Sequence, residues 1–404
     1  MRNSPKLASR EECMGCHACE AACPEGSITF SGKGFFTYPE VNTDTCIGCG
    51  KCEKACDYVR FGFRNDKKDF TQRFFCAHNT YAHERRLATS GGVGGALAAR
   101  AIQLGWQVCG VAFDEEMNVA HIISDDAEIL EKIRGSKYVQ SNVAGIYAKA
   151  IASLRAGQQV LFIGTPCQCQ AMSTVVPASL RSGLLTCAII CHGVNSPKVW
   201  HEYVDFIEKK KGRKLQSYNF RSKDRGWGFG IERAAVKFEN SRVKYLPSWK
   251  NLFMRWFGMH YILQESCFHC PYRIEERYSD MTIGDFWGIE KLLPQEPTRE
   301  GVSVLIVSTE RAMEFVNGVE NLSLKETSAT LTPQKSLRGF TERRSESQIA
   351  AELERRQHFE EEYLKKGFVS MAAKYPPQNT LQRILYHFRY RLRQYGIVKG
   401  ELKK

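Results

Sequence analysis

The distribution of apolar and polar residues divides most of the chain into three parts. Residues 27–45 alternate apolar and polar side chains, which predicts a β-hairpin. Between residues 76 and 330, helix-like apolar spacing alternates with short apolar runs, which predicts an α/β unit. We expect helices at 94–104, 128–133 and 144–154, and strands at 108–113, 160–165, 184–190 and 302–308.

The third part, residues 331–404, is charged and has helical spacing. Near its end several apolar residues share one helical face, with arginines around them: Leu381, Ile384, Leu385, Phe388 and Leu392. We interpret this segment as a helical, basic extension that packs on the preceding domain or on a partner subunit. Contact with a membrane surface is the alternative for such a helix, and nothing else in the sequence supports it.

Composition agrees with a globular protein of two or three domains, since the chain has 404 residues, 43% of them apolar and 25% charged. No run of about 20 apolar residues is present, so we expect no membrane-spanning helix. Residues 1–16 lack the apolar core of a signal peptide. Half of the 16 cysteines crowd into residues 13–56, which is typical of metal binding in a reducing compartment, and we predict a cytoplasmic protein.

Two cysteine motifs with the spacing Cys-x2-Cys-x2-Cys-x3-Cys occupy the N-terminal part. This spacing is that of bacterial two-cluster ferredoxins, in which the fourth cysteine of each motif ligates the other cluster. Zinc knuckles are the alternative, but zinc ribbons use two cysteine pairs and not two complete motifs. We therefore predict two [4Fe-4S] clusters: cluster 1 on Cys13, Cys16, Cys19 and Cys56, and cluster 2 on Cys46, Cys49, Cys52 and Cys23.

Four further cysteines lie in distinctive contexts. Cys167 and Cys191 each follow an apolar run, at the strand ends where α/β proteins place their sites, and Cys267 and Cys270 form a Cys-x2-Cys pair. Together they have the composition of a third four-thiolate site, for an iron–sulfur cluster or for zinc. Cys169 lies close enough to Cys167 in sequence to be a rival ligand.

A glycine-rich segment, residues 90–95, precedes an alanine-rich helical stretch. Backbone N–H groups at such a helix start are able to bind a phosphate, although a glycine-rich helix start is more often a packing feature. The chain contains neither Gly-x-Gly-x-x-Gly nor a Walker A motif, so a Rossmann NAD site and a P-loop are both unsupported.

Six short motifs occur in a fixed order: SGG at 90–92, GSKYV at 135–139, GTPCQ at 164–168, CHG at 191–193, Cys267-x2-Cys270 and TIGDFWG at 282–288. In this order, over residues 76–310, the chain resembles the coenzyme F-420 (deazaflavin) hydrogenase/dehydrogenase beta subunit family, including members fused to an N-terminal ferredoxin. Relatives in that family reduce chlorophyll-type and sulfite substrates, and others are associated with polysaccharide synthesis.

The resemblance implies an FAD beside a third [4Fe-4S] cluster. The cluster is expected on Cys167, Cys191, Cys267 and Cys270, and the FAD on Ser90, Gly91, Gly92, Gly135, Ser136, Lys137 and Tyr138. Three residues are candidates for catalysis. Lys137 would place a positive charge near the flavin or remain a solvated lysine, and His192 would donate a proton or orient a ligand. Asp285 would orient substrate or flavin, or cap the turn after a strand.

These inferences predict an α+β ferredoxin-like domain at 1–62, a linker at 63–75, an α/β flavin- and iron–sulfur-binding domain at 76–330 and the helical extension at 331–404. The expected function is an oxidoreductase that links hydride exchange at FAD, with deazaflavin coenzyme or an organic substrate, to a ferredoxin-type carrier or partner subunit. The alternative is a non-catalytic electron-transfer subunit without flavin, such as one encoded with polysaccharide synthesis functions.

The formal net charge of +13 is the remaining feature, and alone it suggests nucleic-acid or membrane binding. Each [4Fe-4S] core with four thiolates adds roughly two negative charges that this sum omits. Two or three clusters and a flavin would remove about half of the excess. We therefore predict no nucleic-acid partner.

Overall fold

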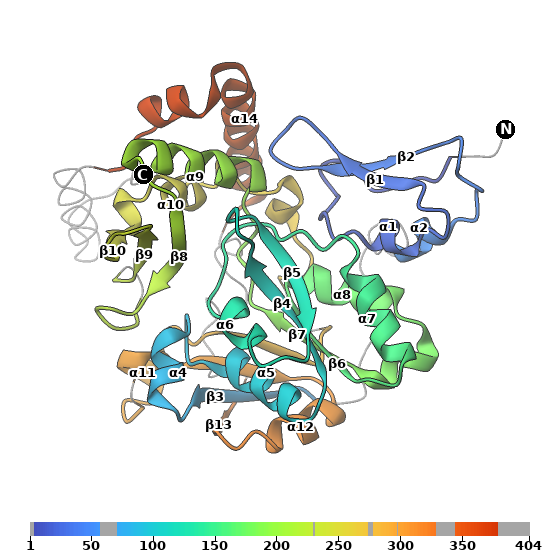
Figure 1. The fold of residues 1–404 in the computed structure, drawn as a ribbon, viewed down its shortest axis with the longest axis vertical. Helices are drawn as coiled ribbons and strands as arrows, with labels where there is room; N and C mark the ends of the chain where they lie inside the picture. Colours follow the sequence, from blue (N-terminus) through green and yellow to red (C-terminus); the bar gives the residue numbers. More distant parts are fainter. Residues whose placement is uncertain are drawn as a thin grey trace.

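The computed structural model describes residues 4–56, 71–228, 231–273, 278–296, 298–328 and 344–378. Most of the predicted 63–75 linker and the apolar stripe at 381–392 lie outside these residues. The N-terminal domain stands to one side of a large mixed sheet, and a smaller sheet lies beside α9 and α10 (Figure 1). No helix in the described ranges is long and apolar enough to cross a membrane.

The N-terminal domain consists of a hairpin and two short helices. Strands β1 (Ile28–Ser31) and β2 (Tyr38–Val41) pair antiparallel, which confirms the hairpin predicted from alternation. Helices α1 (Ala18–Ala22) and α2 (Lys51–Ala55) each carry cysteines of one motif and contact one another. Both helices also contact α8, the helix that begins at the GTPCQ motif, so this domain packs directly on the α/β unit.

The α/β unit is built on an eight-stranded sheet with the order β13-β3-β12-β11-β7-β6-β4-β5. The four central strands, β11, β7, β6 and β4, are parallel neighbours, and antiparallel pairs flank them. The strands are β3 (Arg73–Asn79), β4 (Gln107–Phe113), β5 (Val119–Ser124), β6 (Val160–Gly164), β7 (Leu184–Ile189), β11 (Met281–Asp285), β12 (Ser303–Val307) and β13 (Leu322–Thr327).

Helices α5, α6 and α7 confirm the three sequence-predicted helices, and β4, β6, β7 and β12 confirm the four apolar runs. Those strands are almost continuously buried, as expected for strands covered on both faces. The helices of this unit are α4 (Ala82–Leu87), α5 (Val93–Gln103), α6 (Ile129–Ile133), α7 (Ile146–Arg155), α8 (Pro166–Val175), α11 (Ile289–Leu292) and α12 (Glu310–Asn317).

A second layer covers one end of the large sheet. It contains the antiparallel strands β8 (Leu215–Ser222), β9 (Arg233–Phe238) and β10 (Lys244–Pro247), with helices α9 (Pro197–Lys211), α10 (Leu252–Gly258) and α14 (Glu346–Lys374). Trp200 and Trp256 are fully buried in its aromatic core, and Phe35 of the N-terminal domain packs in the same core. Short 3-10 turns complete the fold at 178–183, 248–250, 265–269 and 298–300.

Candidate functional site

The proposed cluster 1 ligands are gathered at the inner side of the N-terminal domain. Burial raises the pKa of Cys19, and the neighbouring thiols of Cys16, Cys13 and Cys56 raise it further. The structure thus brings together the four side chains assigned to cluster 1, including Cys56 from the second motif. Burial also raises the pKa of Cys52 in the second motif, and the neighbouring thiol of Cys23 in the first motif raises it further. These two thiols are therefore close together, as the crossed arrangement requires.

Tight turns aim backbone N–H groups at these sulfurs. Gly15 has a positive φ of 60° and places its N–H 3.5 Å from Cys13 Sγ, while the N–H of Ser27 lies 3.3 Å from Cys23 Sγ. Such N–H contacts tune the potential of an iron–sulfur cluster. Cys49 is exposed, so proposed cluster 2 lies nearer the surface than cluster 1.

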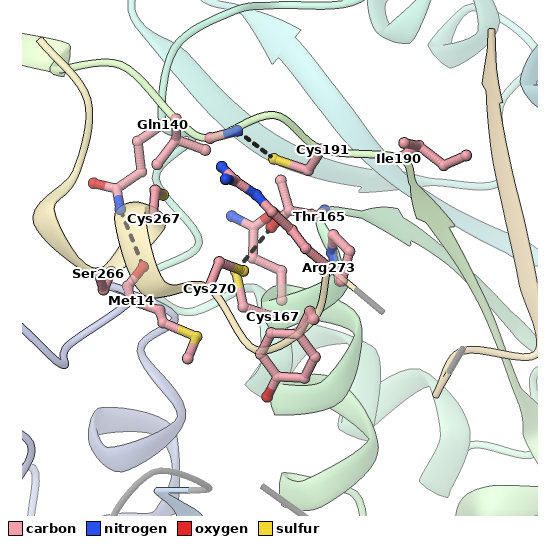
Figure 2. Close-up of a pocket in the computed structure, with 15 residues that line it drawn as sticks. Met14, Gln140, Thr165, Cys167, Ile190, Cys191, Ser266, Cys267, Cys270 and Arg273 are labelled. Carbon is pink, nitrogen blue, oxygen red and sulfur yellow. Dashed lines mark hydrogen bonds between the residues drawn. The ribbon is translucent and has the colours of Figure 1, made fainter. Parts of the chain in front are cut away.

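The other four predicted ligands line one pocket between the two domains. Cys167 lies at the start of α8 after β6, Cys191 follows β7, and Cys267 and Cys270 come from the loop after α10. Figure 2 shows the four cysteine side chains around this pocket together with Arg273. Two carboxyl ends of neighbouring parallel strands therefore supply two of the thiols, at the edge where α/β sheets bind ligands.

Burial dominates the electrostatics of this pocket. It raises the pKa of Cys191 to about 11 and that of Cys267 to about 12, and Cys270 adds to both shifts. The Arg273 guanidinium opposes these shifts. These raised pKa values favour the protonated thiols of Cys191 and Cys267 in the absence of a cation, whereas metal ligation deprotonates a thiol outright. Among the described residues, no group of three or more His, Cys, Asp or Glu side chains meets the spacing for a single metal ion.

Cys169, the rival ligand, lies away from this pocket. Its side chain is buried in the core packed around α7 and α8, and its electrostatic neighbours are Cys187, Asp280 and Cys109. Cys76 is likewise a buried core thiol. None of the sixteen cysteines is joined to another by a disulfide.

The pocket adjoins cluster 1. Met14, the residue after the first proposed ligand of that cluster, lines the pocket. Burial raises the pKa of Cys167, and the nearby thiol of Cys16 raises it further. Tyr147 bridges the two regions, because its hydroxyl donates to the backbone oxygen of Cys16 at 2.9 Å and lies 3.5 Å from that of Gln168. The two candidate iron–sulfur sites are therefore direct neighbours.

A buried polar network holds the GTPCQ turn. The Gln168 amide donates to Ser141 Oγ at 3.0 Å, and Ser141 lies 2.9 Å from Nδ1 of His121. His121 Nε2 lies 3.2 Å from the backbone oxygen of Ile163, which fixes its proton on Nε2 and leaves Nδ1 to accept from the serine. Thr165 completes a capping box with Gln168, so Cys167 sits on a rigid helix start.

Acidification is expected to weaken the fold through His121. Burial lowers its pKa from 6.5 to about 4, so the unfolded chain binds more protons than the folded chain between these values. Stability should therefore fall by roughly 3 kcal/mol as the pH drops from about 6.5 to about 4. Anaerobic thermal unfolding over this range should show a smaller decline for His121→Gln than for the wild type. An equal decline would contradict the assignment.

The predicted flavin segments also meet. The backbone N–H of Ser136 donates to Thr89 Oγ1 at 2.8 Å, which joins the 135–138 segment to the turn before α5. Gly91 is packed so closely that a Cβ there would lie 2.6 Å from the oxygen of Ala77, so only glycine fits. Gly95, in the first turn of α5, faces open space. The first turn of α5 is therefore open on the side of Gly95, whereas Gly91, Gly92 and Val93 are buried.

The three candidate catalytic residues have different surroundings. Lys137 is half-buried, its Nζ donates to the backbone oxygens of Lys132 and Arg134 at 3.0 Å, and burial lowers its pKa to about 7. Lys137 therefore caps the end of α6.

His192, the second candidate, is paired with another histidine. Its Nε2 lies 2.9 Å from His260 Nε2, and His260 Nδ1 lies 2.9 Å from Glu352 on α14.

Asp285, the third candidate, belongs to a charged cluster that the sequence motifs did not reveal. It accepts from Arg221 Nη1 at 2.6 Å and from Trp227 Nε1 at 2.9 Å. Arg221 also contacts the Tyr138 hydroxyl at 3.2 Å and Glu232 at 2.5 Å. Although burial opposes it, the neighbouring Tyr138, Asp285 and Glu232 raise the pKa of Arg221 well above its usual range. Asp285 is thus tied to a predicted flavin residue.

Lys223, two residues after Arg221 in the sequence, is a second buried basic side chain in this region. Its Nζ donates to the backbone oxygens of Ser90 at 2.6 Å and Glu300 at 2.7 Å, and it also contacts the backbone oxygen of Arg85. Three carbonyl acceptors suit an ammonium group. Burial, together with the neighbouring Arg85 and Arg221, lowers the pKa of Lys223 to about 7, so the amine behind the turn at Ser90 is only partly charged at neutral pH. Arg221 and Ser222 end β8 and Lys223 follows it, and no motif in the sequence analysis identified these residues.

Comparisons with known proteins match two regions of the chain. Residues 157–330 match the model of the C-terminal part of the coenzyme F420 hydrogenase/dehydrogenase beta subunit, and residues 12–58 match that of a 4Fe-4S dicluster domain. A chain of the F420-reducing [NiFe] hydrogenase complex from Methanosarcina barkeri is 17% identical, with a TM-score of 0.45 over 74% of this chain and 95% of that chain. No curated protein matches.

The two matched regions contain all of the predicted cluster ligands in their expected order, with both ferredoxin motifs in the first region and the four pocket cysteines in the second. The resemblance predicted from the six sequence motifs is therefore confirmed. Residues 157–330 therefore match the coenzyme F420 hydrogenase/dehydrogenase beta subunit family, and the 4Fe-4S dicluster domain at residues 12–58 makes this chain an iron–sulfur protein related to an oxidoreductase family.

Proposed function

We propose that the chain is an iron–sulfur flavoprotein oxidoreductase that passes electrons between FAD and three [4Fe-4S] clusters. The observation that carries this proposal is the position of the four-cysteine pocket, which touches Met14 beside proposed cluster 1. A ligand site for one cluster placed directly against another is the arrangement that an electron-transfer chain needs. The division into domains at 1–62, 63–75, 76–330 and 331–404 is part of the same proposal.

The pocket residues fit a third [4Fe-4S] cluster. Cys167, Cys191, Cys267 and Cys270 supply four thiols, and the N–H of Gly193 lies 3.3 Å from Cys191 Sγ. Thiolates are the ligands that iron–sulfur clusters require. The positive charge of Arg273 would offset part of the negative charge of such a cluster.

The residues around Ser90 fit the anionic part of FAD. The glycines at the start of α5 would offer backbone N–H donors to a diphosphate. Lys223, which contacts the backbone oxygen of Ser90 and is partly charged at neutral pH, and the neighbouring Arg221 would add positive charge. Residues 135–140 then run from this turn to the four-cysteine pocket, since Ser136 contacts Thr89 and Gln140 lines the pocket. The two proposed cofactor sites are connected by one short segment.

When bound, a flavin exchanges a hydride with an organic partner and single electrons with iron–sulfur clusters. The chain's own residues prepare that exchange. Arg221 orients Asp285 and the Tyr138 hydroxyl toward one another, and the parallel rings of Trp227 and Trp287, with centroids 4.7 Å apart, form an aromatic wall beside them. We propose that this cluster positions the flavin or its hydride partner.

With the exposed Cys49 as a ligand, cluster 2 would lie near the surface, where a ferredoxin-type carrier or a partner subunit would exchange electrons. The hydride partner would be deazaflavin coenzyme or another small organic molecule. A cytoplasmic location remains our prediction from the cysteine usage.

The test is anaerobic purification and reconstitution, followed by titration with deazaflavin coenzyme, NADH, NADPH and reduced ferredoxin while flavin and cluster absorbance are followed. We expect about one flavin per chain and bleaching of both chromophores by at least one donor. Absence of flavin after careful reconstitution would overturn the flavoprotein proposal. Electron transfer through the clusters in such flavin-free protein would support the alternative of a non-catalytic electron-transfer subunit.

A further inference from the structure

The junction between the N-terminal domain and the α/β unit contains two glutamine amides, of the fully buried Gln264 and the half-buried Gln140. Gln264 donates from Nε2 to the backbone oxygen of Cys13 at 2.8 Å. Gln140 lies 3.3 Å from both the backbone oxygen of Met14 and Oε1 of Gln264. A Cβ on Gly15 would come within 2.6 Å of the Gln140 amide, so the glycine permits this close approach.

Gln264 lies close in sequence to one proposed cluster site and contacts the other. It lies three residues before Cys267, a proposed ligand of the third cluster, and its side chain holds the backbone of Cys13, a proposed ligand of cluster 1. Its own backbone N–H donates to Val194, three residues after Cys191. One side chain therefore connects the ligand loops of both sites.

Four charged residues lock this junction from the side of α14: Arg10, Glu265, Arg356 and Glu360, which we call the clasp. Glu265 accepts from Arg10 at 2.7 Å and from Arg356 at 3.0 Å. Glu360 contacts both arginines and accepts from the N–H of Phe35 at 2.6 Å. Arg356 is fully buried and also donates to the backbone oxygen of Leu263 at 2.8 Å.

The clasp joins three segments that are far apart in sequence. In Figure 1 the loop between β1 and β2 reaches toward α9 and α14, where Phe35 contacts Glu360, and Ser196 donates to the Phe35 oxygen at 2.7 Å. Buried ion networks add little net stability, but breaking one leaves buried charges unpaired, so such a network favours one arrangement over others. The clasp therefore fixes the domain junction in which Gln264 sits.

We propose that Gln264, supported by the clasp, is a positioning residue that sets the separation of cluster 1 and the third cluster and hence the rate of electron transfer between them. One electron leaves the reduced cluster and reduces its neighbour, with no proton or leaving group involved. The rate of such a step falls steeply with distance. The inference rests on the proposed function, because it requires the third cluster.

The experiment compares full-length, anaerobically reconstituted wild type with Gln264→Leu. We expect unchanged iron content, because no ligand is lost, but a weaker magnetic interaction between the two reduced clusters by EPR. Electron transfer between them after rapid reduction should be several-fold slower, because the rate falls exponentially as the two clusters move apart. Gln72→Leu is the matched control, because it removes an amide hydrogen bond to Ser308 Oγ at 2.7 Å from a half-buried position before β3, outside the clasp. It should behave as the wild type.

A wild-type rate and magnetic interaction in Gln264→Leu would overturn this proposal alone. Absence of a third cluster signal in the wild type would overturn the proposed function as well. If Gln264→Leu fails to retain its clusters, Gln140→Leu decides the matter, since it removes the contacts to Met14 and Gln264 from a half-buried position. A slower transfer in that variant supports the proposal, and an unchanged rate overturns it.

Discussion

Replacing Cys167 with serine is expected to lower the iron content of the reconstituted chain by about a third, from about twelve to about eight atoms. The pocket would then offer three thiols, while the eight ferredoxin cysteines would be untouched. Electrons would no longer pass between the flavin and the dicluster domain, because the centre that separates them would be missing. Iron analysis and EPR of the reduced protein measure the first effect, and stopped-flow reduction measures the second.

Cys169→Ser is the matched control for that experiment. The two cysteines are two positions apart on α8, but Cys169 faces the core near Cys187 and Cys109. We expect full iron content and normal electron transfer in this variant, with at most a modest loss of stability from a polar group placed in the core. Loss of a cluster in Cys169→Ser but not in Cys167→Ser would reverse the ligand assignment and move the third site.

The metal-binding part of the molecule is largely visible in the sequence. Ferredoxin spacing is local, so Cys13 to Cys56 were recognised without knowledge of the fold, and the loops after β6 and β7 were expected at one sheet edge from the apolar runs alone. The structure gathers Cys167, Cys191, Cys267 and Cys270 at one pocket. Their identity as cluster ligands remains a proposal that the iron content of Cys167→Ser tests.

The residues that organise these ligands were not predictable in the same way. Gln264 and Cys13 are separated by 251 positions, and Arg10 and Glu360 by 350. Neither glutamines nor single charges have a spacing that identifies such partners. Lys137 is a related case: the GSKYV motif predicted either a charge near the flavin or a solvated lysine, and its contacts with the carbonyls at the end of α6 followed from neither. Sequence patterns identify local chemistry, and tertiary contacts decide where each side chain points.

Replacing Arg221 with methionine is expected to have the largest effect outside the cysteines. Arg221 comes from β8 of the small sheet and contacts Asp285 at the end of β11 in the large sheet, so it joins the two layers. Its loss would leave Asp285 and Glu232 as neighbouring, mostly buried carboxylates without their cation. Breaking a buried pair in this way costs about 3–5 kcal/mol. We expect a lower anaerobic unfolding temperature and loss of flavin on gel filtration.

Two further variants separate charge from geometry in that experiment. Arg221→Lys keeps a positive charge but lacks the planar fork that contacts both carboxylates, so it should retain part of the stability and bind flavin weakly. Arg73→Met removes an arginine from an exposed pair with Glu326, and because surface pairs contribute about 0–1 kcal/mol, it should leave stability and flavin content nearly unchanged. If Arg221→Met retained its flavin while its stability fell, Arg221 would join the two sheets without taking part in the cofactor site.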